Sequence, residues 1–412
     1  MKMLALLLAA IATPAAAAPI AIVHAEAWTL TSATPVRDAT IVIDAGNIVS
    51  VTARGAVPAG ATVINAAGKP VTPGFINAAT QVGLTEVSSA NDTRDTASVS
   101  EDVGPAFDVS YALNGNSTLV DLARADGLTR TLSFPGPSSV APFSGMAAMT
   151  RLRAGADILD KAQAAMFAVI GGGAWDKGAG SRGAQWSLLR AALDEAQSPT
   201  PVTGEKPLLN RRNLAAMRRV LAGAMPLAVV THRESDIRQA VKLAAQYRVK
   251  VVIVGGTEAW RAADVLAAAH IPVVLDPLAN LPVTFDQLGA RQDNAAILTK
   301  AGVTVAFGLV GGVIEQSYNA GLVMREGAGL AVSNGMSKID ALRAVTVNAA
   351  AIWGGRAATL APGAAADVVV WDGDPFEPSS GAVTVIVEGK QVGITTRQTE
   401  LQRRYAPKPV TP

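Results

Sequence analysis

The stretch Val71-Thr-Pro-Gly-Phe-Ile-Asn-Ala-Ala-Thr-Gln-Val-Gly83 decides the fold expected for this chain. A Pro-Gly pair leads into an apolar run over residues 75–82, and an apolar run that begins after turn residues is typical of a buried β-strand. Alternate residues of a strand point to the same face. Asn77, Ala79 and Gln81 are therefore expected to share one face of this strand.

The length and composition indicate a globular α/β protein. The chain has 412 residues, of which 50% are hydrophobic, with 38 Gly and 23 Pro. This is long enough for one large domain with a smaller companion. The 35 basic and 33 acidic residues leave a net charge of +2 and are scattered, so neither a nucleic-acid partner nor a polybasic membrane patch is indicated.

The N-terminus has the layout of a secretory signal peptide. Met1-Lys2-Met3 precedes a short apolar run over residues 4–11 and then Ala-x-Ala sequences, which predicts cleavage after Ala17. The run is shorter than the roughly 20 residues that span a bilayer, so no membrane span is expected. The chain has no cysteine, which excludes disulfides and thiolate metal sites. We expect a periplasmic or secreted protein.

Beyond the signal peptide (1–17), the pattern suggests three parts. Residues 18–70 contain short alternating strands separated by turns, and residues 356–412 contain further strands, so both ends of the chain are expected to pair. Residues 71–355 alternate apolar runs with amphipathic ones, as βα units require. Strands are expected at 75–82, near 106–113, and at 128–134, 166–170, 226–231, 249–254, 271–275 and 303–307, with helices at 236–247, 258–269, 294–301 and 339–353.

Several segments, in their order and spacing, resemble the amidohydrolase superfamily of imidazolonepropionase-like type. The first strand resembles the one that carries Asp-x-His-x-His in that family, and Leu360-Ala-Pro-Gly-Ala-Ala-Ala-Asp-Val-Val-Val-Trp-Asp-Gly-Asp-Pro375 is similar to the family's C-terminal run. The resemblance covers nearly the whole mature chain. It implies a (β/α)8 TIM-like barrel with a small composite β-sandwich domain formed from both chain ends.

The resemblance also implies a site for one or two divalent metals, such as zinc, at the carboxyl ends of the barrel strands. The family's ligands are two His on strand one, often a Lys on strand four, one His each on strands five and six, and an Asp on strand eight. The chain has three His in all, so a full set cannot exist, and we predict no metal cofactor. The corresponding positions are Ala79, Gln81, Val230, Gly255 and the vicinity of Gly308, with Lys177 in the loop beyond strand four.

His232 is the polar group expected in the mouth of the barrel. It is a residual ligand, a general base near its ordinary pKa of about 6.5, a substrate hydrogen-bond donor, or a structural histidine beside Arg233 and Asp236. Asp236 and Glu258 either begin helices, where a carboxylate favours the positive end of the dipole, or assist His232 in catalysis. Gln81 and Arg233 are the candidate substrate-binding residues.

Three functions remain open from the sequence. The first is a non-catalytic partner subunit of a related C–N bond hydrolase with an intact His-x-His, or a homo-oligomer. The second is an active hydrolase of cyclic amides, acylated amino acids or dipeptides, which uses His232 with Asp236 or Glu258. The third is a periplasmic small-molecule-binding protein that uses the vacated pocket.

Overall fold

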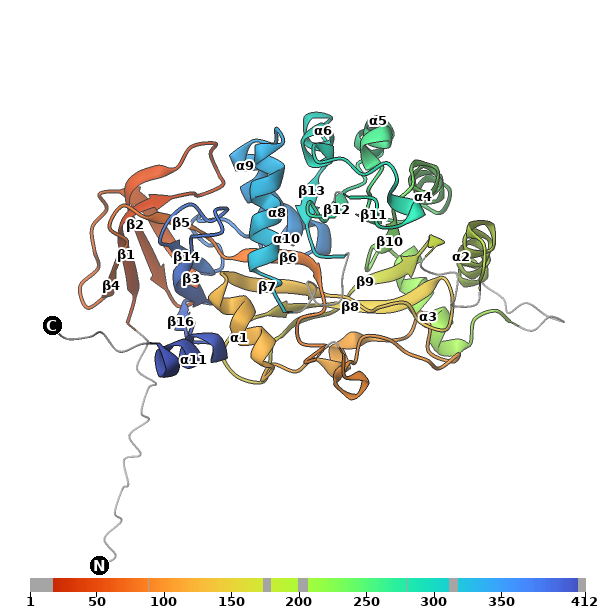
Figure 1. Ribbon diagram of the computed structural model, residues 1–412, viewed down its shortest axis with the longest axis horizontal. Helices are drawn as coiled ribbons and strands as arrows, with labels where there is room; N and C mark the ends of the chain where they lie inside the picture. Colours follow the sequence, from red (N-terminus) through yellow and green to blue (C-terminus); the bar gives the residue numbers. More distant parts are fainter. Residues whose placement is uncertain are drawn as a thin grey trace, which may run out of the picture.

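The computed structural model describes residues 18–87, 89–172, 179–198, 207–279, 281–310 and 318–406. These residues form two sheets of eight strands each, with helices packed around one of them (Figure 1). The predicted signal peptide lies outside the described residues. None of the helices within the described ranges is long and apolar enough to cross a bilayer.

The first sheet, here called the terminal sheet, combines strands from both ends of the chain. The strand β14 lies antiparallel beside β5, with Val369 opposite Thr72, so the predicted pairing of the chain ends is confirmed. The strands follow the order β16-β15-β14-β5-β1-β2-β3, with β4 on β1. Their bounds are β1 Ile20–Ala27, β2 Val36–Asp44, β3 Asn47–Ala53, β4 Thr62–Asn65, β5 Pro70–Pro73, β14 Val368–Trp371, β15 Ala382–Val387 and β16 Lys390–Val392.

The second sheet is a nearly closed barrel. Its edge strands β6 and β13 meet where the Leu309 N–H donates to the Ala79 carbonyl at 2.7 Å, so the predicted TIM-like barrel is confirmed. The strands follow one another around the barrel in chain order. They are β6 Phe75–Thr80, β7 Leu128–Ser133, β8 Phe143–Arg151, β9 Leu159–Val169, β10 Leu227–Thr231, β11 Val251–Gly255, β12 Val273–Leu275 and β13 Val305–Phe307.

The barrel departs from an all-parallel arrangement at its third strand. The strand predicted near residues 106–113 is wrong, because β7 pairs directly with β6 and residues Val109–Ala112 form the short 3-10 helix η2. The third strand is β8, which runs antiparallel to both β7 and β9. Every residue of β8 is buried, so its sequence lacks the alternation by which a half-buried strand is recognised.

The helices α4, α5, α6 and α8 lie outside the strands β10 to β13 (Figure 1). The helix predicted over residues 339–353 is divided in two at Thr346, whose backbone is not helical. The helices are α1 Thr118–Ala125, α2 Arg182–Gln197, α3 Arg211–Leu221, α4 Glu234–Tyr247, α5 Ala263–Ala268, α6 Asn294–Lys300, α8 Leu322–Ser333, α9 Lys338–Ala344, α10 Val347–Trp353 and α11 Arg397–Tyr405, with 3-10 turns η1 Asn91–Thr93, η4 Ala259–Ala262 and η5 Phe285–Gln287.

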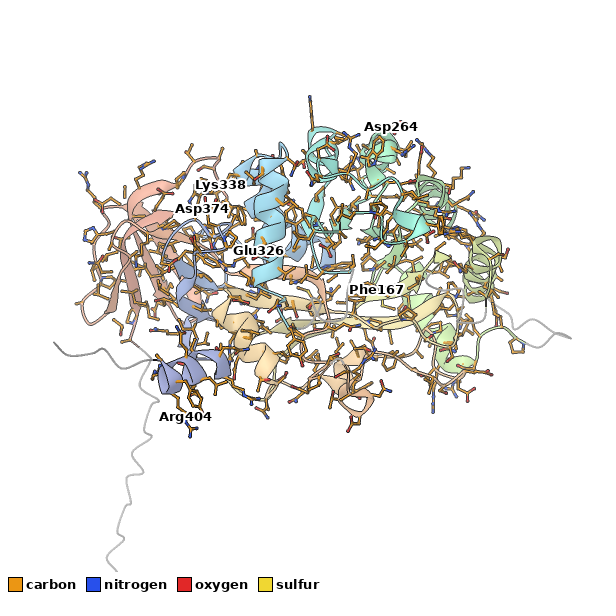
Figure 2. All side chains as sticks on the ribbon, in the orientation of Figure 1. Phe167, Asp264, Glu326, Lys338, Asp374 and Arg404 are labelled. Carbon is orange, nitrogen blue, oxygen red and sulfur yellow. The ribbon has the colours of Figure 1, made fainter. Side chains whose placement is uncertain are left out.

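Large apolar side chains fill the barrel interior. The ring of Phe167, labelled in Figure 2, stacks on Phe134 with centroids 5.1 Å apart and lies 6.0 Å from the indole of Trp353. Around them pack small and branched residues of β6, β9, β11 and β12. The interior is therefore a packed core and not a channel, as is usual for barrels of eight strands.

A buried ion pair ties the barrel to the terminal sheet. Arg130 of β7 donates from Nε to Asp367 Oδ2 at 2.7 Å, and its Nη1 donates to the carbonyl of Arg356 at 2.7 Å. The two charged side chains are 1% and 5% exposed. Because burial of charge is tolerated only with close pairing, this contact fixes how the two sheets meet.

Candidate functional site

The carboxyl ends of β6 and β13 meet at the mouth of the barrel without room for a ligating side chain. A Cβ added to Gly308, just after β13, would lie 2.6 Å from the Ala79 nitrogen and 2.9 Å from its Cβ. Real Cβ atoms do not approach a backbone nitrogen this closely, so only glycine fits at position 308. The expected ligand positions on strands one and eight are thus packed directly against each other.

Asn77 stabilises the end of β6 through hydrogen bonds to the backbone. Its Oδ1 accepts from the Ala79 N–H at 3.1 Å, and its Nδ2 donates to the Ala320 carbonyl at 2.9 Å. The residue is fully buried. Each polar end of the amide is therefore satisfied by backbone, which is the usual state of a buried polar side chain.

His232 follows β10 and turns its ring across the end of β11. Its Nδ1 lies 2.8 Å from the hydroxyl oxygen of Thr257. A Cβ added to Gly255 would lie 2.8 Å from the His232 Cε1, so the imidazole fills the space above this glycine. Burial lowers the pKa of His232 below its ordinary value, and the nearby charge of Asp286 opposes this only in part. The ring is therefore neutral at pH 7.

Arg233 belongs to a cluster of paired charges beside His232. Its Nε lies 3.2 Å from Asp286 Oδ1, and Arg182, at the start of α2, donates to the same oxygen. The other oxygen of Asp286 accepts from the Gly172 N–H at 2.7 Å. A glycine turn that could bind an external anion thus holds a carboxylate of the chain itself.

The carboxylates of Asp236 and Glu258 make structural contacts in and around α4. Asp236 is buried and accepts from Trp186 Nε1 at 3.0 Å, with Arg182 Nε 3.2 Å from its other oxygen. Glu258 Oε2 accepts from the Glu234 N–H at 2.9 Å and so satisfies a free amide in the first turn of α4. Among the described residues, neither carboxylate hydrogen-bonds His232.

The other predicted substrate-binding residue, Gln81, lies on a different side of the mouth. Its side chain is buried, and its Nε2 lies 3.7 Å from the place that a Cβ on Gly136 would occupy. No hydrogen bond of the described residues joins it to His232 or Arg233. The structure therefore brings His232 and Arg233 together near Asp286, and it places Gln81 apart from them.

Three residues of this site were missed in the sequence. Arg182 and Asp286 lie 104 residues apart, so no local pattern links them. Thr257 lies 25 residues from His232 in the sequence, so no local pattern indicates that its hydroxyl contacts the ring. A signal was present only in the position of Thr257 directly after the predicted sixth strand, where side chains of a barrel face its mouth.

The described residues do not fit a divalent metal. They contain no group of three or more His, Asp or Glu side chains that could hold one. The strand ends present Ala79, Val230 and Gly255, none of which offers a side-chain donor. Lys177 and residues 311–317 lie outside the described ranges.

The space beside Thr257 is small. A cavity of about 20 Å³ lies against Gly255, Thr257, Asp276 and Asn294. Such a volume holds a single water. The polar side chains around His232 therefore contact one another, and the cavity beside them is too small for a substrate.

Comparisons with known proteins agree with this architecture. The model of the Amidohydrolase family matches residues 261–392. An amidohydrolase from Thermotoga maritima superposes with a TM-score of 0.79 at 25% identity, covering 91% of this chain and 99% of the other. No match was found among curated protein sequences.

Two further solved structures share the fold at lower similarity. A prolidase in complex with N-methylphosphonate-L-proline has 19% identity and a TM-score of 0.55, and covers 91% of this chain and 99% of its own. An adenosine deaminase from Xanthomonas campestris with bound zinc has 18% identity and a TM-score of 0.52, covering 91% and 92%.

The barrel and the terminal sheet are the architecture that this chain shares with these solved structures. Residues 261–392 thus match the Amidohydrolase family, and the fold of the described chain is similar to that of solved amidohydrolase structures.

Proposed function

We propose that this protein is an exported, metal-independent member of the superfamily that acts as a non-catalytic partner subunit of a related C–N bond hydrolase. Residues 1–17 are its signal peptide. In this role the barrel keeps the shape of its relatives and offers a surface to a chain whose metal site is intact.

The packing of the mouth carries this proposal. The Gly308 and Ala79 positions touch, and the His232 ring lies over Gly255. A metal site needs three or four side chains that converge on one point, and each of these contacts removes the space for one of them. The charges of Arg182 and Arg233 are already paired with Asp286, so they are not free to bind a substrate carboxylate.

An exposed loop beside the mouth supports a protein partner. The apolar loop, residues 281–288, turns Asp286 and Gln287 inward and leaves large apolar side chains in solvent. Val283 is 78% exposed and Phe285 is 82% exposed. A cluster of large apolar side chains in solvent is typical of a surface that binds another protein. Leu281 and Leu288 complete this group.

Metal analysis tests the absence of a catalytic centre. The mature protein is incubated with excess zinc, passed through a desalting column and analysed by mass spectrometry, and it is assayed against amides, acylated amino acids and dipeptides. We expect well below one zinc per chain and no turnover. Stoichiometric zinc that a chelator removes, together with turnover lost on chelation, would overturn the proposal.

Co-purification tests the partner role. The chain is coexpressed with a related hydrolase that contains His-x-His, and complex formation is measured by light scattering. The double variant Leu281→Ser/Phe285→Ser is expected to abolish the complex and leave thermal unfolding unchanged. Tyr405→Ser, on the exposed face of α11, is the matched control and should retain it. Failure to form any complex would contradict this role, and a homodimer in its place would redirect it to self-association.

The contact between His232 and Thr257 favours one second candidate, a metal-independent hydrolase. A neutral imidazole 2.8 Å from a hydroxyl could act as a general base. Such an enzyme forgoes the several kcal/mol that a Lewis acid supplies. It would show turnover that is insensitive to chelators and is lost in His232→Ala.

A further inference from the structure

A large cavity lies at the end of the barrel opposite His232. A cavity of about 650 Å³ is formed by the residues that precede β10, β11 and β12 and by the end of α10. Pro226 precedes β10 and His232 follows it, so the cavity lies roughly 20 Å from the mouth at the usual rise of a strand. Its volume lies in the range of small-molecule sites.

The walls of this basal cavity are apolar. Its lining includes Val252 and Ile271, which are nearly buried, and Ile352 of α10, which is partly exposed. Pro226 and Pro272 stiffen the segments that enter β10 and β12. A rigid apolar wall favours the apolar body of a ligand over water.

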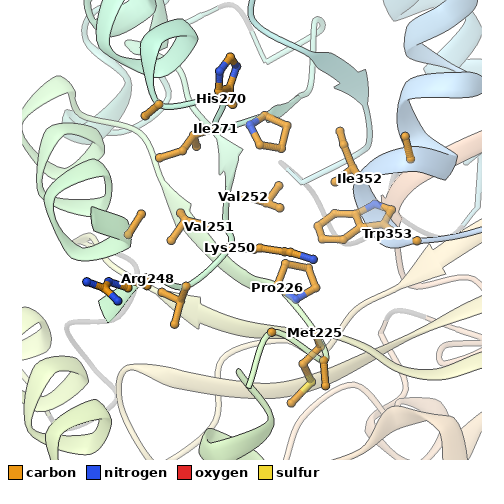
Figure 3. A pocket seen from close by; sticks show the side chains of 18 of the residues that line it. Met225, Pro226, Arg248, Lys250, Val251, Val252, His270, Ile271, Ile352 and Trp353 are labelled. Atoms are coloured by element: carbon orange, nitrogen blue, oxygen red, sulfur yellow. The ribbon is translucent and has the colours of Figure 1, made fainter. Parts of the chain in front are cut away.

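Two ammonium groups approach the end of α10 in this cavity. Lys161 Nζ donates to the Trp353 carbonyl at 2.9 Å. The side chain of Lys250, which is exposed, extends across the pocket toward Pro226 and Trp353 (Figure 3), and its ammonium makes no hydrogen bond or ion pair with any described residue. The lining contains no Asp or Glu. Arg248 and His270 add further basic groups at its edge, with Arg248 directed away from the centre.

We propose that the basal cavity binds a small amphipathic carboxylate. Its carboxylate lies near the ammonium groups of Lys161 and Lys250, and its apolar body lies against Val252, Ile271 and Ile352. The exposed Lys250 ammonium can form a charge-assisted hydrogen bond with the anionic end of a ligand, while the hydrocarbon end of the ligand covers the apolar wall. This inference is independent of the function proposed for the mouth.

The cations also lie near helix C-termini, whose partial negative charge they stabilise. That role alone requires no ligand, and the two explanations make different predictions. If the cations serve only the helix ends, removal of the Lys250 charge lowers stability and no carboxylate binds.

Calorimetry distinguishes these explanations. Octanoate and 4-phenylbutyrate are titrated into the mature protein, with 1-octanol as the uncharged probe. We expect saturable binding of both carboxylates, about tenfold weakening in Lys250→Gln, as one lost charge-assisted hydrogen bond predicts, and much weaker binding of the alcohol. Lys242→Gln, on the exposed side of α4 and outside the cavity, is the matched control and should bind as the wild type does.

Two results would overturn the inference. One is the absence of saturable heat with either carboxylate, and the other is equal affinity of wild type and Lys250→Gln. His232→Ala is measured in parallel, because loss of binding in that variant would place the ligand at the mouth and not in the basal cavity. Thermal unfolding of each variant confirms that it is folded.

Discussion

The imidazole of His232 occupies the space that a side chain at Gly255 would need, with its Cε1 only 2.8 Å from the ideal Cβ position. Positions 232 and 255 both lie at strand ends, where side chains of a barrel can carry function. Because the His232 ring fills the space above residue 255, no side chain fits at position 255 beside it. A histidine at position 255 and the present conformation of His232 cannot coexist.

Gly255→Ala should destabilise the protein by about 2 kcal/mol, since it combines overpacking against the ring with a left-handed backbone. The double variant Gly255→Ala/His232→Ala should recover the steric part. Gly60→Ala reports the backbone part alone, because Gly60 has a similar φ of +74° with nothing near its Cβ position. Urea unfolding of these variants and of the single variant His232→Ala gives the values that the comparison needs, and additivity of Gly255→Ala and His232→Ala in the double variant would show that the ring and the glycine are not coupled.

His232 should make stability fall at acidic pH. Burial lowers its pKa in the folded state, so the unfolded chain binds more protons just below pH 6.5. The stability that this group contributes is therefore complete above the unfolded pKa and is lost as the pH falls through the folded pKa. Unfolding free energies between pH 7.5 and 5 should decrease more steeply in the wild type than in His232→Gln. Equal slopes would refute the buried, neutral ring.

Asp286 should be the most sensitive carboxylate of the mouth. Asp286→Asn removes the counter-charge of Arg233 and one of the two carboxylates that pair with Arg182, the other being Asp236. We expect a loss of about 2 kcal/mol, less than for a fully buried pair because both arginines are partly exposed. Asp293→Asn removes the partner of Arg291 at the surface and should cost less than about 0.5 kcal/mol. Chemical unfolding measures the free energy of unfolding of both variants. Equal losses of stability would show that the Asp286 cluster contributes no more than an exposed surface pair.

The ion pair between Arg130 and Asp367 should stabilise the junction of the two sheets. Asp367→Ala leaves a guanidinium buried without its partner and should cost about 3–5 kcal/mol. The double variant Arg130→Met/Asp367→Ala should recover part of this loss, because it removes the unpaired charge as well. Asp38→Asn is the control for which we expect no measurable change, because Asp38 pairs with Arg54 and His24 at the exposed surface and asparagine suits its left-handed backbone. A double variant that is no more stable than Asp367→Ala would contradict this interpretation.

The elements that the sequence predicted most accurately are those indicated by residues next to one another in the chain. The turn before Phe75 predicted the start of β6, and the alternating pattern within residues 18–70 predicted short strands of the kind that the structure contains there. The helix predicted from residue 339 begins at Lys338 in the structure, where the Ser337 hydroxyl accepts from the Asp340 N–H at 3.2 Å and donates to the Asp340 carboxylate.

The contacts of the site depended on positions that no local pattern connects. The sequence identified His232 and Arg233 from their place after a strand, but their partners come from other loops of the barrel. The roles of Asp236 and Glu258 were left open because a carboxylate at the start of a helix looks the same whether it contacts Trp186, an amide or a substrate. The burial of each carboxylate and the groups around it decide which role it has, and both are known only from the folded structure.

The terminal sheet has a consequence for biosynthesis. Pro73 lies opposite Val368, so nearly the whole barrel is translated between two neighbouring strands. Until the later strand emerges, the nascent protein carries β5 with one side unsatisfied, and such an edge invites pairing with other chains. A premature stop before residue 368 would therefore produce an aggregating polypeptide and not a smaller, independently folded barrel.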